Sequence, residues 1–248
     1  MIKENLTNLY NSIPKNINLV AVTKTKTNDD IMNAYNSGQR LFGENKVQEL
    51  TNKYNDLPKD IKWNMIGHLQ TNKVKYIASF IDLIHSLDSI KLAKEINKQG
   101  EKNNRAIDCL IQIKISSDES KYGIGFDDFD KLYNDTLDLK FVNVVGLMGM
   151  ASFTNDEKKI KNEFKLISSL FNKLKLVNKK FTYLSIGMSN DYKLAINTYH
   201  TLTLTDVPPE TIANAMQTGD VEVIECSDYE PDVTWDEYEM SWNDFLKI

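Results

Sequence analysis

Residues 18–24, NLVAVTK, form an apolar run that ends in a lysine, and an amphipathic stretch, NDDIMNAYNSGQR, follows at 28–40. This pattern predicts a buried strand and then a helix, with Asn28 as its N-cap and Gly38 at its end. The link between them, VTKTKTND, is not the glycine-rich turn that follows the first strand of a dinucleotide-binding domain. We therefore expect neither an open Rossmann sheet nor a nicotinamide cofactor.

The same order of strand and helix repeats along most of the chain. The run at 107–115, IDCLIQIKI, is apolar enough to be covered on both faces, as strands of parallel sheets are, and places Cys109 in the core. The clearest helix follows Thr154 and Glu157, which have the spacing of a capping box. The other predicted strands span 40–45, 63–68, 82–89, 143–150 and 183–189.

Seven such units, and an atypical eighth strand at 199–205, favour a single (β/α)8 TIM-type barrel in a chain of 248 residues. The hydrophobic share of 41% and the charged share of 26% are ordinary for a soluble globular protein. The N-terminus lacks the apolar core of a secretory signal, and no stretch has the length of a spanning helix. We expect a cytoplasmic protein with no membrane role.

The C-terminal segment differs in charge from the rest of the chain. Of the 35 acidic residues 12 lie in 206–248, whereas only one of the 30 basic residues does. We expect 1–205 to form the barrel and 206–248 to be a divergent acidic segment, into which the last barrel helix would fall. The lysines of the barrel are spread over many segments without interleaved aromatics, so no nucleic-acid partner is expected.

A barrel of this type builds its site at the carboxyl ends of its strands. The residues predicted there supply an amine, amides, hydroxyls and backbone N–H groups, without a Ser/His/Asp triad, a metal-ligand cluster or a pair of acid/base carboxylates. Such groups suit an anionic ligand with a carbonyl, because a lysine can add to an aldehyde and hydroxyls can hold a phosphate. Spacing alone favours Lys24 only weakly over Lys26.

Six motifs in order resemble those of the pyridoxal 5′-phosphate homeostasis family (YggS in bacteria, PROSC in animals) over about residues 18–197. They are LVAVTKTK, GQRLFGENKVQE, WNMIGHLQTNK, IQIKISSDESKYGI, GLMGMA and LSIGMSNDYKLAI. The resemblance implies a single barrel of the alanine racemase N-terminal type that binds pyridoxal phosphate (PLP) without turnover and hands it to apo-enzymes. We expect the protein to be a monomer. Racemases of this type use a second domain, for which this chain is too short, so we expect no racemase activity.

The resemblance also implies which residues bind the cofactor. Lys24 matches the lysine that forms the imine, and Ser185 and Ser189 match the serines of the phosphate site. Asn45 and Met148 match two further positions, although Asn45 could instead cap the helix after it and Met148 could fill the core. Lys26 is expected to be a supporting charge, and the roles of Lys73 and Lys121 stay open.

Two departures from the family bear on cofactor binding. Asn64 replaces a histidine, and the Arg-x-Gly-Ser/Thr phosphate segment expected after residue 197 is absent. Asp206, Pro208 and Pro209 stand there instead, which predicts weaker phosphate binding, because a carboxylate repels phosphate and proline lacks an N–H. An alternative function is therefore an interaction protein with weakened or lost PLP binding that acts through its acidic tail.

Overall fold

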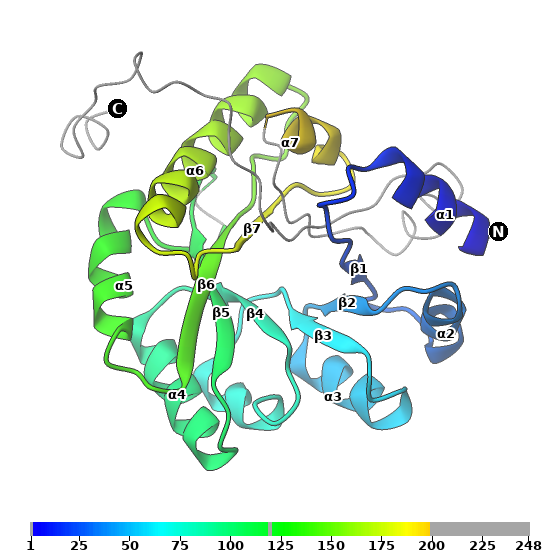
Figure 1. Ribbon diagram of the computed structural model, residues 1–248, viewed down its shortest axis with the longest axis horizontal. Helices are drawn as coiled ribbons and strands as arrows, with labels where there is room; N and C mark the ends of the chain where they lie inside the picture. Colours follow the sequence, from blue (N-terminus) through cyan, green and yellow to red (C-terminus); the bar gives the residue numbers. More distant parts are fainter. Residues whose placement is uncertain (1, 119–120, 199–248) are drawn as a thin grey trace.

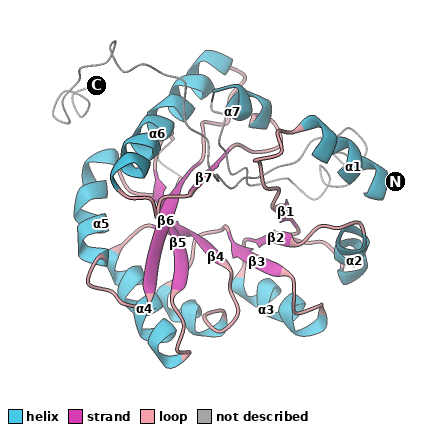
Figure 2. Ribbon diagram, viewed as in Figure 1, coloured by secondary structure: helices cyan, strands magenta, loops and turns pink. Residues whose placement is uncertain are grey.

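The computed structural model describes residues 2–118 and 121–198, in which seven parallel strands form one sheet. The sheet curls around a common centre, and the helices lie outside it (Figures 1 and 2). The strands are β1 (Ala21–Val22), β2 (Leu41–Glu44), β3 (Lys62–Met65), β4 (Leu83–Leu87), β5 (Ile107–Ile113), β6 (Val142–Gly149) and β7 (Tyr183–Ile186). The helices are α1 (Ile2–Ser12), α2 (Asn28–Asn36), α3 (Val47–Asp56), α4 (Ile90–Lys102), α5 (Phe129–Thr136), α6 (Glu157–Val177) and α7 (Tyr192–Thr198), with 3-10 turns η1 (Thr71–Tyr76) and η2 (Phe126–Asp128).

Each strand pairs with its neighbours in the sequence, in the order β1 to β7. The register places Val22 beside Gly43 and Gly43 beside Asn64. Because every pair is parallel, the carboxyl ends of all seven strands lie at one end of the curled sheet, which we call the mouth. The strand-and-helix repeat and the barrel-type architecture predicted from the sequence are thereby confirmed, while the eighth strand predicted at 199–205 lies outside the described residues.

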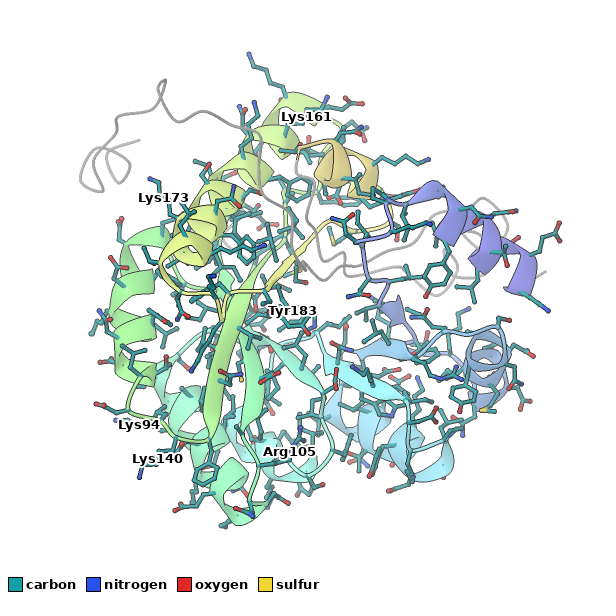
Figure 3. All side chains as sticks on the ribbon, viewed as in Figure 1. Lys94, Arg105, Lys140, Lys161, Lys173 and Tyr183 are labelled. Carbon is teal, nitrogen blue, oxygen red and sulfur yellow. The ribbon has the colours of Figure 1, made fainter. Side chains whose placement is uncertain are left out.

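The apolar core has two parts. The larger part lies between the sheet and the helices and includes Cys109, which is fully buried as predicted. The smaller part lines the concave side of the sheet and consists of Leu83, Leu110, Val145 and Met148, with Tyr183 packed against it (Figure 3). Burial of both strand faces explains why β5 and β6 are almost continuously apolar.

Several local predictions were wrong. Helix α2 is capped by Thr27, whose side chain accepts the Asp30 N–H in a capping box, and not by Asn28. Helix α6 is capped by Asp156. Thr154 instead accepts the Asp156 N–H with its hydroxyl, so the capping box predicted with Glu157 is absent. Helix α1 had no counterpart in the prediction. None of the helices in the described ranges is long and apolar enough to cross a membrane.

Candidate functional site

Lys24 lies in a tight turn two residues beyond the end of β1. The turn is closed by a hydrogen bond of 2.9 Å from the Lys26 N–H to the Thr23 carbonyl oxygen. Thr25, at its third position, has φ = 65°, which glycine adopts readily and a β-branched residue rarely does. The half-buried Lys24 therefore occupies the second position of a turn whose third residue is strained.

A cluster of charges lies next to this turn, in which Glu44 and Lys53 are buried and Glu49 is 25% exposed. The Lys53 ammonium on α3 donates to Glu49 Oε1 at 2.6 Å, to Glu44 Oε1 at 2.7 Å and to the Thr23 carbonyl oxygen at 2.6 Å. Glu49 Oε1 also accepts the Thr25 N–H at 2.6 Å. Burial raises the pKa of Glu44, although the hydrogen bond from Lys53 opposes the shift.

A second buried polar chain crosses the concave side of the sheet. His85 Nε2 lies 3.0 Å from Asn64 Oδ1, and His85 Nδ1 lies 3.0 Å from Ser185 Oγ. Asn64 Nδ2 donates to the carbonyl oxygens of Phe42 and Lys62, so its Oδ1 is free to accept from His85 Nε2–H. The Ser185 hydroxyl then donates to Nδ1, because that nitrogen carries no proton in this tautomer. Burial lowers the pKa of His85 to about 3, which keeps the ring neutral.

The structure places the five predicted cofactor residues at two depths. Met148 and Ser185 are register partners on β6 and β7, both buried inside the sheet, and Met148 does fill the inner core. Ser189 is buried in the loop between β7 and α7. Lys24, two residues beyond β1, and Asn45, directly after β2, lie at the mouth.

Asn45 is placed by a close approach between β2 and β3. A Cβ atom on Gly67 would lie 2.4 Å from the Asn45 carbonyl oxygen, so only glycine leaves room there. The Asn45 side-chain oxygen Oδ1 is buried and has no hydrogen-bond partner. Helix α3 begins at Val47 with Lys46 at its N-cap, so Asn45 is not the helix cap considered as an alternative. Its orphaned amide oxygen is available to a bound molecule.

The loop that follows β7 turns sharply at Gly187, where φ is 89°. The Asp191 carboxylate accepts the Met188 N–H. Burial raises the pKa of Asp191 to about 6, and the bond from Met188 and the charge of Lys121 only partly oppose the shift. This loop and the one after β6 border a groove of about 610 Å³ whose walls include Phe153, Met188 and Leu194.

The loops after β5 and β6 are joined on one side of the mouth. Ser116 Oγ lies 2.9 Å from Ser152 Oγ, and Ser152 donates from both its N–H and its hydroxyl to Glu163 at 2.6 Å. The Lys121 ammonium donates to the Ala151 carbonyl oxygen, so this lysine is not simply solvated.

Tyr122 from the same loop stacks on His68, with ring centroids 4.2 Å apart. His68 Nδ1 in turn lies 3.1 Å from Asp88 Oδ2. These contacts connect the loops after β3, β4 and β5 at the rim.

Sequence reasoning missed three groups that organise this region: Glu49, Lys53 and His85. The four-residue spacing of Glu49 and Lys53 on a predicted helix was a usable signal for an ion pair, but nothing in the sequence indicated that Lys53 would be buried. His85 lies inside an apolar strand, and its partners on β3 and β7 are 21 and 100 residues away in the sequence.

The groups at the mouth fit an aldehyde with a phosphate. Lys24 supplies an amine, Asn45 an unpartnered amide oxygen, and the Ser189 loop a hydroxyl beside a turn that glycine permits. The described residues contain no cluster of three His, Cys, Asp or Glu side chains that could hold a metal ion. Lys161 and Lys173 on α6, Lys94 on α4 and Lys140 just before β6 all lie on the outside of the molecule (Figure 3).

Comparisons with known proteins give consistent matches. The family described as "Alanine racemase, N-terminal domain" matches residues 1–207. The pyridoxal phosphate homeostasis protein of Aquifex aeolicus is 38% identical over 180 residues, which is 72% of this chain and 79% of that protein. The protein of the same name from Escherichia coli is 33% identical over 187 residues, 74% of this chain and 80% of that one.

Solved structures agree with the sequence matches. PipY from Synechococcus elongatus without PLP superposes with a TM-score of 0.75 at 32% identity, covering 80% of this chain and 94% of PipY. PipY with PLP bound gives a TM-score of 0.72 at 30% identity with the same coverage. An alanine racemase from Clostridium difficile 630 superposes with a TM-score of 0.61 at 13% identity, over 77% of this chain and 50% of the racemase, a similarity of fold alone.

Proposed function

The chain belongs to the pyridoxal phosphate homeostasis family, and from this membership we propose that it is a non-catalytic protein that binds PLP, buffers it and releases it to apo-enzymes. The relatives are named for PLP homeostasis and not for racemisation, and PipY has been solved with PLP bound. The observation that carries the proposal is the position of Lys24, a half-buried residue two positions beyond the carboxyl end of β1.

Lys24 is the residue that would hold the cofactor covalently. The PLP aldehyde would supply a carbon that condenses with the Lys24 amine, with loss of one water molecule. A half-buried position suits a carrier, because it limits the access of other amines to the aldehyde while leaving a route for release.

The other predicted residues would orient the group. The Asn45 amide has a buried oxygen with no partner, and Ser189 lies in the loop after β7, so each can donate or accept a hydrogen bond at the rim. The Ser185 hydroxyl donates to His85, so we propose that Ser185 supports the floor of the site together with Met148 and that phosphate binding rests mainly on Ser189.

Absorbance spectroscopy of the purified full chain tests the proposal. Added PLP should give the band of a protonated imine, and borohydride reduction followed by peptide mass spectrometry should locate the label on Lys24. The Lys24→Ala variant should lose both signals. The matched control Lys26→Ala, two residues away in the same turn, should keep both. A wild-type chain that gives no band and no label would refute the carrier function, and a label on another lysine would refute the role of Lys24.

The proposal extends to the domain boundary and the oligomeric state. We propose that residues 1–205 form the PLP-binding unit and that the protein acts as a monomer, with apo-enzymes as its recipients. Sedimentation of the PLP-loaded chain tests the monomer. Transfer of PLP to an apo-enzyme, measured as recovery of that enzyme's activity, tests the recipients. Reactivation by the PLP-loaded chain that is no faster than by the same concentration of free PLP would contradict a delivery role.

A further inference from the structure

We propose that Glu49 and Lys53, an ion pair on α3, are positioning residues that hold the backbone of Lys24 from both sides and so direct its amine into the site. The inference deepens the proposed function and rests on it for its ligand. The two residues lie on one face of the helix, four positions apart, with Nζ and Oε1 2.6 Å apart.

Lys53 and Glu49 form hydrogen bonds with the two peptide groups that flank Lys24. Lys53 Nζ donates to the carbonyl oxygen of Thr23, which belongs to the peptide group before Lys24. Glu49 Oε1 accepts the N–H of Thr25, which belongs to the peptide group after Lys24. The two contacts are both 2.6 Å long, so the orientation of the Lys24 Cα–Cβ bond is fixed by groups from a different element.

The clamp opposes relaxation of the strained backbone at Thr25. A β-branched residue at φ = 65° is unfavourable, and such a conformation persists only where its surroundings impose it. The bond from the Thr25 N–H to Glu49 is a contact that imposes it. Without that bond we expect the turn to relax toward an ordinary φ, which would rotate the peptide group that carries Lys24.

The clamp is itself held in place. The three contacts of the Lys53 ammonium use all of its N–H donors, and its side chain is only 6% exposed. Glu44, which is fully buried, bonds both Lys53 and the Thr23 hydroxyl. By contrast, the Glu157–Lys161 pair on α6 has the same four-residue spacing but is 67% and 43% exposed. That pair serves as the matched control.

Two measurements on the full chain test the clamp. The first is the rate of covalent PLP binding, measured from the growth of the imine absorbance band. The second needs no PLP: the rate at which acetic anhydride labels Lys24 relative to the exposed Lys94, measured by peptide mass spectrometry. In Glu49→Ala we expect PLP binding to slow about tenfold and Lys24 labelling to rise about tenfold. The lower end of the free-energy cost of a strained φ corresponds to about this change in the population of the strained turn. Glu157→Ala should change neither.

Rescue separates positioning from general stability. Glu49→Gln keeps an acceptor for the Thr25 N–H and should retain PLP binding within about threefold, since a neutral hydrogen bond replaces a charge-assisted one. Adding Thr25→Gly to Glu49→Ala should restore PLP binding in part, because glycine adopts φ = 65° without strain but is not held there. Lys53→Met, which removes the other grip, should slow PLP binding like Glu49→Ala.

The outcomes distinguish the clamp from the carrier function. If the wild type fails to bind PLP but Glu49→Ala still changes Lys24 labelling, the carrier function fails and the clamp stands. If Glu49→Ala folds and leaves both rates unchanged, the clamp is refuted. If Glu49→Ala does not fold, Lys53→Met decides: unchanged Lys24 labelling in that variant refutes the clamp.

Discussion

His85 should make the protein sensitive to acid, and the effect can be calculated. Burial lowers its pKa from the ordinary 6.5 to about 3 in the folded protein. Between these two values the unfolded chain binds a proton that the folded chain does not. The stability that the neutral ring contributes is therefore complete above pH 6.5 and is lost as pH falls toward 3, by about 1.4 kcal/mol per pH unit.

The variant His85→Gln removes this titration while keeping the hydrogen bonds. A glutamine amide can donate to Asn64 Oδ1 and accept from the Ser185 hydroxyl, as the imidazole does. At about pH 7.5 we expect the variant to be less stable than wild type by about 1–2 kcal/mol, because the shapes differ. At about pH 4.5 the wild type should have lost about 3 kcal/mol through His85 and the variant nothing through this position, so their order should invert.

Urea denaturation followed by circular dichroism at the two pH values measures the difference. Ser185→Ala is the control, because it removes one hydrogen bond but leaves the buried imidazole, so it should retain the acid-dependent loss that His85→Gln abolishes. A stability gap between wild type and His85→Gln that does not change with pH would refute the reasoning that burial keeps the ring neutral.

Three further predictions concern other parts of the chain. Asp191→Asn keeps an acceptor for the Met188 N–H but cannot titrate. Because burial raises the pKa of Asp191 from 3.8 to about 6, the free energy of unfolding of wild type should fall by about 3 kcal/mol relative to the variant as pH rises from about 4 to about 7 in the same urea assay. Gly146→Ala would place a Cβ 1.7 Å from the Tyr183 carbonyl oxygen, so we expect a loss of about 3 kcal/mol or more, and a melting temperature equal to wild type would contradict this packing. Deleting 206–248 should leave the imine band intact; a full chain that binds no PLP but captures a partner only when the acidic segment is present would favour the interaction protein.

Much of the fold could be predicted from the sequence because its signals are local. Apolar runs bounded by polar segments located seven strands, and their alternation with amphipathic stretches indicated parallel pairing. The errors were local as well. Thr27 and Asn28 are both good helix caps, as are Thr154 and Asp156, and only the backbone conformation decides which side chain reaches the free N–H groups.

The candidate site could be predicted only in part. Lys24 could be placed at the mouth because a strand end fixes its position. Its clamp could not, because Glu49 and Lys53 look like an ordinary exposed ion pair in the sequence. Only the packing of α3 against the ends of β1 and β2 buries Lys53 and partly covers Glu49. Ser185 illustrates the same limit: the family resemblance predicts it in the phosphate site, and nothing in the sequence indicated the hydrogen bond that joins its hydroxyl to His85.

The sequence by itself therefore determined the order of the elements, and with the family resemblance it predicted the end of the sheet at which the site lies and Lys24 as its amine. Only the tertiary structure decided which polar groups face one another, because the contacts from His85 to Ser185 and from Lys53 to Thr23 join residues 100 and 30 positions apart. Periodicity reports which side of a strand or helix is buried, but it carries no information about the partner buried against it.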